Sequence, residues 1–163
     1  MNVHSDPRVT ISEASDRKDV EDSQELMLEY FHSLGVNLSF QDIDREMGSF
    51  PGEYSPPSGA LLIARVGDIP AGCVALRPLE DGSCEMKRLF VRPEFRKLSI
   101  GKRLAEAIIR KAKELGYPAM KLDTISELKP ALSLYRKLGF LEIPQYRYNP
   151  LEGAIFMELK FRS

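Results

Sequence analysis

A short basic segment that ends in glycine is the part of the sequence best suited to bind a ligand. It consists of residues 96–101, Arg-Lys-Leu-Ser-Ile-Gly, and lies between an apolar run that ends at Val91 and a helical pattern that begins near Ile100. A helix start offers unpaired backbone N–H groups and the positive end of the helix dipole, so a tight turn there can bind a pyrophosphate. Gly101 would let a phosphate approach the backbone closely. The same pattern also suits an ordinary helix start.

The sequence around this segment resembles the acetyl-CoA-binding motif of the GNAT superfamily of N-acetyltransferases. The motif's signature is Arg or Gln, two residues, Gly, one residue, then Gly or Ala. Arg96 and Gly101 match its ends within CEMKRLFVRPEFRKLSIGKRLAEAIIRKAKELGYPAMKLDT, and ALSLYRKLGF at residues 131–140 resembles the family's next motif, including its tyrosine at Tyr135. The resemblance covers roughly residues 60–159. It implies a GNAT-like domain with acetyl-CoA as the acyl donor.

Two positions depart from the family's pattern. Ser99 stands where the first glycine of the signature is usual, so the turn must tolerate a Cβ atom. Leu128 stands where many members carry an asparagine that contacts the cofactor arm. Neither change removes the backbone donors at the helix start, so we expect acetyl-CoA binding to persist.

The resemblance also implies that the strand from Leu89 to Val91 is bulged and splays from its neighbour. An opened strand leaves backbone groups free for the thioester and pantetheine, and the N–H of Leu89 or Val91 would stabilise the oxyanion. The acetyl-CoA-binding residues implied in this way are Leu89, Phe90, Val91, Arg96, Lys97, Leu98, Ser99, Ile100, Gly101 and Lys102.

Acyl transfer to an amine requires the amine in its neutral form. An alkylammonium with a pKa of about 10.4 is deprotonated at roughly one part in 2,500 at pH 7, so a base or a water relay must help. The resemblance assigns this role to Glu85, six residues before Val91. Lys87 lies about 7 Å further along the same strand face, where its charge would lower the pKa of Glu85 and favour an indirect role through water. The alternative interpretation of Glu85 is a solvated carboxylate beside the Asp81-Gly82 turn.

The leaving group calls for an acid. Coenzyme A leaves as a thiolate, for which a thiol pKa of about 8.5 is the reference, and a tyrosine hydroxyl with a pKa near 10 can protonate it. Tyr135 matches the family's acid position. Its alternative role is to cap the core from an amphipathic helix.

Candidate acceptor residues lie in two irregular segments. Tyr54 lies in a loop rich in proline and glycine, and Tyr146, Arg147 and Tyr148 lie in IPQYRYNP. An aromatic site with one guanidinium would suit a small amine that carries a carboxylate, such as an amino acid, because arginine binds carboxylates in a bidentate way. Alternation along an extended segment would instead place Arg147 opposite both tyrosines, as a surface residue.

Hydrophobic periodicity predicts the elements that must position these residues. The fold class is α/β (α+β), with a mixed, mostly antiparallel central sheet of about six or seven strands flanked by about four helices. Gly35, Gly116 and Gly139 mark helix ends, and residues 48–59 form a loop. The predicted strands are 9–13, 60–66, 71–77, 84–91, 120–123, 140–143 and 154–159, and the helices are 16–34, 41–47, about 100–115 and 131–138.

Composition adds limits on partners and location. The 163 residues, of which 43% are hydrophobic, suffice for one core, so residues 1–163 are expected to form a single N-acetyltransferase domain. The 23 Lys plus Arg against 24 Asp plus Glu lack the basic excess of a nucleic-acid-binding protein. The N-terminal residues lack a signal-peptide pattern, and no apolar run approaches the roughly 20 residues that span a bilayer. We therefore expect a cytoplasmic protein without nucleic-acid or membrane partners.

The cysteines and histidines predict neither a disulfide nor a metal site. The hairpin register places the Cα atoms of Cys73 and Cys84 roughly 20 Å apart, so both are expected to be core thiols. The two imidazoles, His4 and His32, are not spaced to join the cysteines in a ligand cluster. We predict no bound metal.

These observations predict an N-acetyltransferase that moves the acetyl group of acetyl-CoA to a primary amine of a small molecule or a protein. The amine attacks directly, with Tyr135 as general acid and Glu85 as general base, directly or through water. The alternative is a non-catalytic acyl-CoA-binding or sensing module, against which the presence of both residues argues. A nucleotide-binding domain would need a glycine-rich loop after the first strand or a P-loop Lys-Ser or Lys-Thr pair, and neither occurs. The apolar strand at 154–159 could lie at a sheet edge and pair with a second copy, which favours a homodimer.

Overall fold

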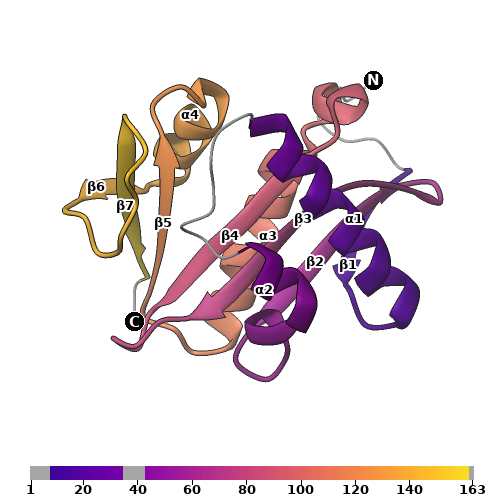
Figure 1. Ribbon diagram of the computed structural model, residues 1–163, viewed down its shortest axis with the longest axis horizontal. Coiled ribbons are helices and arrows are strands. Elements are labelled where there is room, and N and C mark those ends of the chain that lie inside the picture. Colours follow the sequence, from indigo (N-terminus) through magenta and orange to yellow (C-terminus); the bar gives the residue numbers. More distant parts are fainter. Residues whose placement is uncertain (1–7, 35–42, 162–163) are drawn as a thin grey trace.

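Seven strands form one sheet in the computed structural model, which describes residues 8–34 and 43–161. The strands are β1 (Val9–Glu13), β2 (Ala60–Val66), β3 (Ile69–Pro78), β4 (Cys84–Val91), β5 (Ala119–Ile125), β6 (Leu141–Ile143) and β7 (Ala154–Lys160). Their order across the sheet is β1-β2-β3-β4-β5-β7-β6 (Figure 1). All neighbouring strands are antiparallel except β4 and β5, which are parallel. The mixed, mostly antiparallel sheet predicted from the sequence is confirmed.

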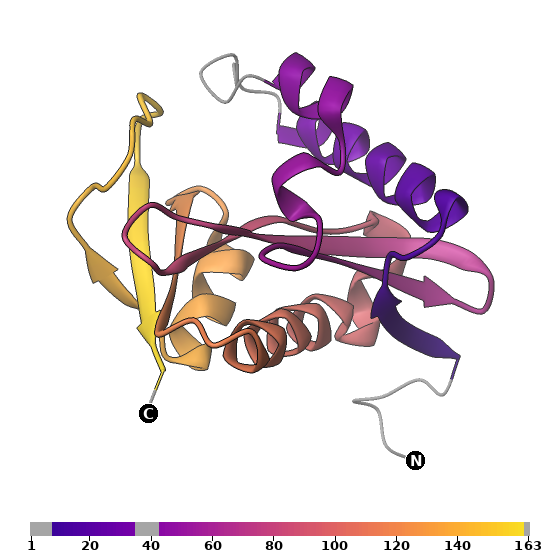
Figure 2. The same ribbon diagram turned by 90° about the horizontal axis from the view of Figure 1, so that it is seen from below.

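Helices cover both faces of this sheet, as Figure 2 shows. One face carries α1 (Arg17–Leu34) and α2 (Ile43–Ser49), and the other carries α3 (Ile100–Glu114) and α4 (Lys129–Leu138). Two short 3-10 helices, η2 (Gly52–Tyr54) and η3 (Pro93–Leu98), lie in the connections after α2 and β4. The four α-helices of the described residues match the expected number.

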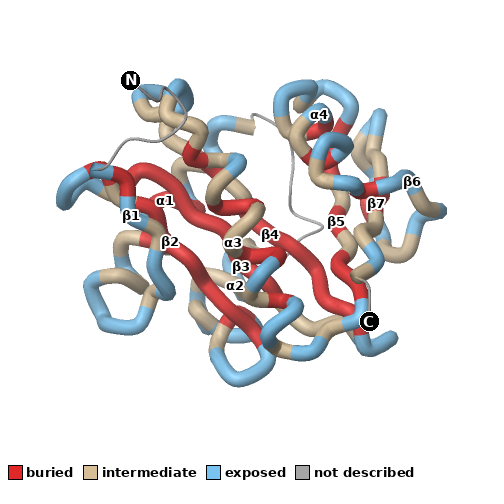
Figure 3. The backbone as a smooth tube through the Cα atoms, turned by 180° about the vertical axis from the view of Figure 1, so that it is seen from behind, coloured by how far each residue is buried: buried red, intermediate tan, exposed pale blue. Residues whose placement is uncertain are grey.

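Two hydrophobic cores, one on each face, hold the layers together. Successive side chains of a strand point to opposite faces, so β2 sends Leu62 toward α3 and Ile63 toward α1. Residues of α3 spaced three or four apart, such as Leu104 and Ile108, are fully buried against the sheet. Figure 3 shows the resulting buried path along β2, β3 and β4, the strands that lead to the candidate site.

The strand predicted at 154–159 is not a sheet edge. It forms β7, which pairs with β5 on one side and β6 on the other. The prediction of a sheet edge there is therefore wrong, because β6 pairs with residues 156–158 of β7. Of the predicted helix 41–47, residues 43–47 are helical in α2, whereas residues 41–42 and Gly35 lie outside the described residues.

The two cysteines are buried and unpaired, as expected. Among the described residues, no group of three or more His, Cys, Asp or Glu side chains is arranged to hold a metal ion. Within the same part of the chain, no helix has the length and apolar composition needed to cross a membrane.

Candidate active site

Strand β4 parts from β5 after its first two residues. The described strands pair only at Cys84 and Glu85 of β4, and beyond them β4 and β5 diverge (Figure 1). On the other side of β4, the register against β3 shifts between Cys73 and Ala75, and Arg88 adopts a φ of 61°. This is a β-bulge, which leaves the second half of β4 open toward β5. The bulge and the splay that the resemblance implies are both confirmed.

The start of α3 is arranged to accept an anion. Ser99 precedes the helix in the left-handed conformation, with φ 58° and ψ 26°, and its side chain does not cap the helix. The first-turn N–H groups are thus left for a ligand. A Cβ atom on Gly101 would make only an ordinary contact, 3.7 Å from a Val91 methyl group, so packing does not require glycine there. Arg96 donates a hydrogen bond to the Val91 carbonyl (3.0 Å), which ties the turn to the end of β4. These features fit the pyrophosphate of the expected acyl donor.

Tyr135 projects from α4 into the protein. Its side chain is buried, and its ring meets Phe140 edge-on, with centroids 5.8 Å apart. Among the described residues its hydroxyl makes no hydrogen bond. Burial raises the pKa of Tyr135 above its ordinary value, with smaller contributions from Tyr30 and Asp123. The hydroxyl therefore stays protonated and has a proton to donate.

Glu85 is completely buried and held on both oxygens. Oε1 accepts a hydrogen bond from Nε of Arg77 (2.8 Å), and Oε2 accepts one from the Tyr146 hydroxyl (2.5 Å). Burial by itself would raise the pKa of Glu85. Lys87, Arg77, the Tyr146 hydrogen bond and Arg147 together outweigh it, so the pKa lies below the ordinary value. This carboxylate is therefore ionised, stabilised by hydrogen bonds and nearby positive charges, and a weak base.

Lys87 is a buried lysine with few partners. Its side chain is 6% exposed, and its Nζ lies 3.9 Å from Oε1 of Glu85, an ion pair beyond hydrogen-bonding distance. Within the described residues the ammonium makes no other ion pair and no hydrogen bond. Burial, assisted by the neighbouring Arg88, lowers the pKa of Lys87 to about 8, although Glu85 and Asp123 act in the opposite direction.

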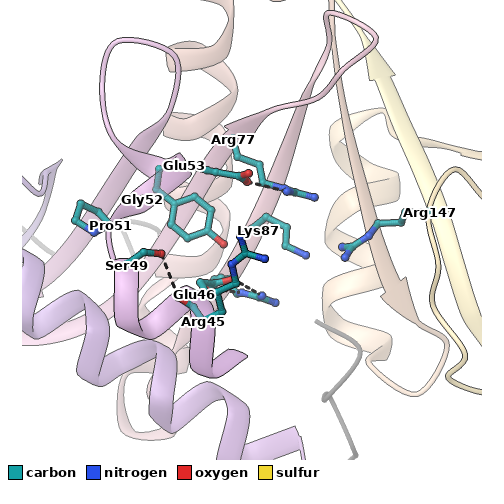
Figure 4. A pocket seen from close by; sticks show the side chains of 11 residues that line it. Arg45, Glu46, Ser49, Pro51, Gly52, Glu53, Arg77, Lys87 and Arg147 are labelled. Carbon is teal, nitrogen blue, oxygen red and sulfur yellow. Dashed lines mark hydrogen bonds and ion pairs between the residues drawn. The ribbon is translucent and has the colours of Figure 1, made fainter. Parts of the chain in front are cut away.

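A basic pocket of about 580 Å³ opens beside these two residues. Five of its lining side chains are cationic and two are acidic, and they come from α2, η2, β3, β4 and the segment between β6 and β7 (Figure 4). The lining residues are Arg45, Glu46, Ser49, Pro51, Gly52, Glu53, Tyr54, Arg77, Lys87, Arg88 and Arg147.

Two of the arginines are neutralised within the pocket. Arg77 bonds Glu53 (2.7 Å) as well as Glu85, and Arg88 bonds both oxygens of Glu46 at 2.7 and 3.2 Å. The Arg88–Glu46 pair joins the bulge of β4 to α2, and so fixes the helix that forms one wall of the pocket.

Arg147 is held less completely. Its Nη1 is buried without a hydrogen bond, and lies 3.6 Å from Oε2 of Glu85 and 3.7 Å from Oδ1 of Asp123. Figure 4 shows the ends of the Arg147 and Lys87 side chains pointing toward one another across the pocket. A polar group between them would complete their contacts.

The sequence-predicted acceptor residues separate into two groups. Tyr54 and Arg147 line the pocket, and Tyr146 reaches Glu85 with its hydroxyl. Tyr148 is 69% exposed and does not line the pocket. Arg147 was expected to lie opposite both tyrosines if the segment were extended. That alternation fails because the segment is not a strand, and Tyr146 and Arg147 both turn toward Glu85.

Apart from Lys87, which was recognised as a neighbour of Glu85, the sequence did not predict the other charged residues of the pocket lining. Arg77 carried a usable signal, since it stands directly opposite Glu85 in the β3–β4 register. A tight turn at Asp81-Gly82 would instead place residue 84 opposite about residue 79, whereas Cys84 pairs with Pro78. Arg88 and Glu46 had no such signal, because the bulge that redirects Arg88 is invisible in the hydrophobic pattern.

Comparisons with known proteins agree with this geometry. Residues 21–140 match the acetyltransferase (GNAT) family. An uncharacterised N-acetyltransferase of Schizosaccharomyces pombe is 40% identical over 154 residues, which cover 93% of this chain and 94% of the relative. The N-acetylaspartate synthetase of Danio rerio is 30% identical over 139 residues, 78% of this chain and 49% of the relative. A GNAT-family acetyltransferase structure from Staphylococcus aureus superposes with a TM-score of 0.78 at 22% identity, covering 94% of this chain and 99% of that one. The chain therefore belongs to the GNAT family of acetyltransferases and is an acyltransferase.

Proposed function

We propose that the protein transfers the acetyl group of acetyl-CoA to the primary amine of a small molecule that also carries a carboxylate. The observation that carries this proposal is the basic pocket, in which Arg147 and Lys87 point toward one another with incomplete contacts. A carboxylate would complete the contacts of the arginine, which binds such groups in a bidentate way. The synthetase relative supports the same class, since its name denotes the acetylation of an amino acid.

The donor half of the proposal uses the opened strand and the start of α3. The pyrophosphate of acetyl-CoA lies against the first-turn N–H groups of α3, with charge from Arg96, Lys97 and Lys102. The thioester lies beside the second half of β4. An N–H of Leu89 or Val91 donates to the carbonyl oxygen as negative charge develops on it, which lowers the energy of the tetrahedral intermediate.

Tyr135 completes the transfer. The amine nitrogen bonds to the thioester carbon, the C–S bond breaks, and the Tyr135 hydroxyl gives its proton to the departing thiolate. The raised pKa of Tyr135 suits this role, because a buried hydroxyl stays protonated until the thiolate forms. Solvent then restores the proton.

Glu85 has a different part from the one first expected. Both of its oxygens are occupied and its side chain is completely buried, so the acceptor amine has no direct path to it. In this proposal Glu85 anchors Arg77, Tyr146 and Arg147, and thereby shapes the acceptor pocket.

The proposal is tested by calorimetric titration of acetyl-CoA, followed by measurement of thiol release with matched acceptors. The pairs are L-alanine with ethylamine, and L-glutamate with 4-aminobutyrate, each amino acid differing from its partner by the α-carboxylate. We expect the amino acids to be preferred, and Arg147→Gln to remove the preference. The exposed Arg110→Gln on α3 serves as the control. Acetyl-CoA binding without thiol release for any amine would favour the sensing module instead. Equal rates for L-alanine and ethylamine would favour an acceptor without a carboxylate, whereas equal rates for L-glutamate and 4-aminobutyrate would show only that the carboxylate need not be the α-carboxylate.

A further inference from the structure

The proposed acceptor arrives almost entirely as an ammonium ion, so a group in the pocket must take its proton before the nitrogen can attack. That group must reach the pocket and have a pKa near the working pH. Glu85 meets neither condition, because it is buried behind its partners and its pKa is lowered. Among the described residues that line the pocket, Lys87 carries a nitrogen base whose pKa lies near neutrality.

Position favours Lys87 as well. It lies two residues before Leu89 on β4, so its side chain leaves the strand next to the part that binds the thioester. An amine in contact with Lys87 therefore lies close to the acyl carbon that it must attack. Arg147 approaches from the opposite wall (Figure 4), and an amino acid offers an amine to Lys87 and a carboxylate to Arg147.

We propose that the neutral amine of Lys87 accepts the proton of the acceptor's ammonium group, with Glu85 as the buried counter-ion of the lysine ammonium that forms. This inference rests on the proposed function. The 3.9 Å separation of Nζ from Oε1 places the negative charge where it stabilises the protonated lysine without competing for the acceptor. Glu85 thus acts through Lys87, as the third group of a catalytic triad acts through its base.

The proton transfers balance. One proton passes from the acceptor ammonium to Nζ of Lys87, and the neutral nitrogen then bonds to the thioester carbon. The nitrogen's second proton leaves to solvent as the amide forms, and the thiolate takes the proton of Tyr135, which then regains one from solvent. Lys87 returns its proton to solvent through the pocket mouth, and no other reactant is consumed.

The charge on Lys87 depends on groups that approach it from several elements. Burial lowers the pKa of Lys87 to about 8, so a useful fraction is neutral at pH 7. The charged and titratable groups that face it are Glu85 and Arg88 on β4, Arg77 on β3, Asp123 on β5 and Arg147 beyond β6, with Arg45, Glu46, Glu53 and Tyr54 across the pocket.

The test compares two acceptors of the same shape. β-Alanine carries an ammonium group, whereas aminooxyacetate has an oxygen in place of one methylene and a nitrogen that is already neutral at pH 7. In the wild-type enzyme, we expect kcat/KM for β-alanine to level off near pH 8, where Lys87 becomes neutral. The value for aminooxyacetate should stay flat between pH 6 and about pH 9, because this acceptor needs no base.

Two results in the wild-type enzyme would overturn the inference. If kcat/KM for aminooxyacetate falls above pH 8, Lys87 is required as a cation and binds the carboxylate. If kcat/KM for β-alanine keeps rising to about pH 10, the amine enters in its neutral form and Lys87 takes no proton.

The variant Lys87→Met gives an independent readout. We expect kcat/KM for β-alanine to fall by about 10² to 10⁴, and that for aminooxyacetate to fall by less than about threefold. Equal losses for both acceptors would refute the assignment. Acetyl-CoA binding verifies the fold, and Lys111→Met, at a lysine that pairs with Glu13 away from the pocket, is the matched control. Ethylamine and methoxyamine form the same pair without a carboxylate, so a wrong acceptor class and a wrong base give different results.

Discussion

Replacement of Tyr135 by phenylalanine tests the proposed acid with little disturbance of the fold. The substitution removes one hydroxyl group and keeps the ring that packs against Phe140. Within the described residues that hydroxyl makes no hydrogen bond, so its loss leaves no partner unsatisfied. We expect the free energy of unfolding to change by less than about 1 kcal/mol.

The catalytic effect should be much larger. General acid assistance is worth about 10² to 10⁴ in rate, so kcat should fall by that factor while the Kd for acetyl-CoA stays unchanged. Burial raises the pKa of Tyr135, so the wild-type enzyme should show no loss of activity up to about pH 10 from ionisation of this group. The raised pKa also means that the Tyr135 hydroxyl is fully protonated at neutral pH.

Thiol release under saturating acetyl-CoA measures kcat, and calorimetry measures the Kd. The matched control is Tyr117→Phe. In the wild type the Tyr117 hydroxyl donates a hydrogen bond to the Ser58 carbonyl outside the site, so the variant should lose about 1 kcal/mol of stability and no activity. A Tyr135→Phe enzyme that keeps kcat within about threefold of wild type would refute the reasoning, because the thiolate would then leave without acid help.

Three further substitutions have defined outcomes. Gly72→Ala places a Cβ atom 2.6 Å from the Phe90 carbonyl oxygen, so we expect a loss of about 1–3 kcal/mol in denaturant unfolding and weaker acetyl-CoA binding by calorimetry. Ser99→Gly relieves the strain of a non-glycine residue in the left-handed conformation. It should raise the free energy of unfolding by about 1 kcal/mol without weakening acetyl-CoA binding, and a destabilised variant would contradict this expectation. Glu85→Gln removes a charge that raises the pKa of Lys87, so the levelling of kcat/KM for β-alanine should move below pH 8. Because the pKa of Glu85 is lowered in the folded state, its charge stabilises the protein above its unfolded pKa, near 4.3, and the stability gap between wild type and Glu85→Gln should shrink as the pH falls below that value.

The helices and strands could be predicted closely because each has a local pattern of hydrophobic periodicity and turn residues. The strands 9–13, 60–66 and 84–91 match β1, β2 and β4 in full, since the first alternates apolar and polar residues and the other two are apolar-rich runs near turn residues. The order of the strands across the sheet could not be predicted from such local patterns. Nothing local to residues 154–159 indicates that β7 inserts between β5 and β6, because that pairing depends on contacts distant in sequence.

The candidate site was predictable where a motif fixes it and not where tertiary contacts build it. The turn before α3 and Tyr135 followed from the motifs. The carboxylate of Glu85 was located correctly on β4, but its partners were not, because Tyr146 and Arg147 reach it from a segment without periodicity. Lys87 was recognised as a neighbour of Glu85, while its burial emerged only with the sheet packed around it.

The most direct test of the account is the ratio of kcat/KM for L-alanine to that for ethylamine, with thiol release as the assay and mass spectrometry to identify the acetylated product. We expect L-alanine to be acetylated on its amine and preferred by at least about tenfold, as expected for one carboxylate bound by the partly buried guanidinium of Arg147. An enzyme that acetylates ethylamine as well as or better than L-alanine would contradict the account, because the basic pocket would then have no part in selecting the acceptor.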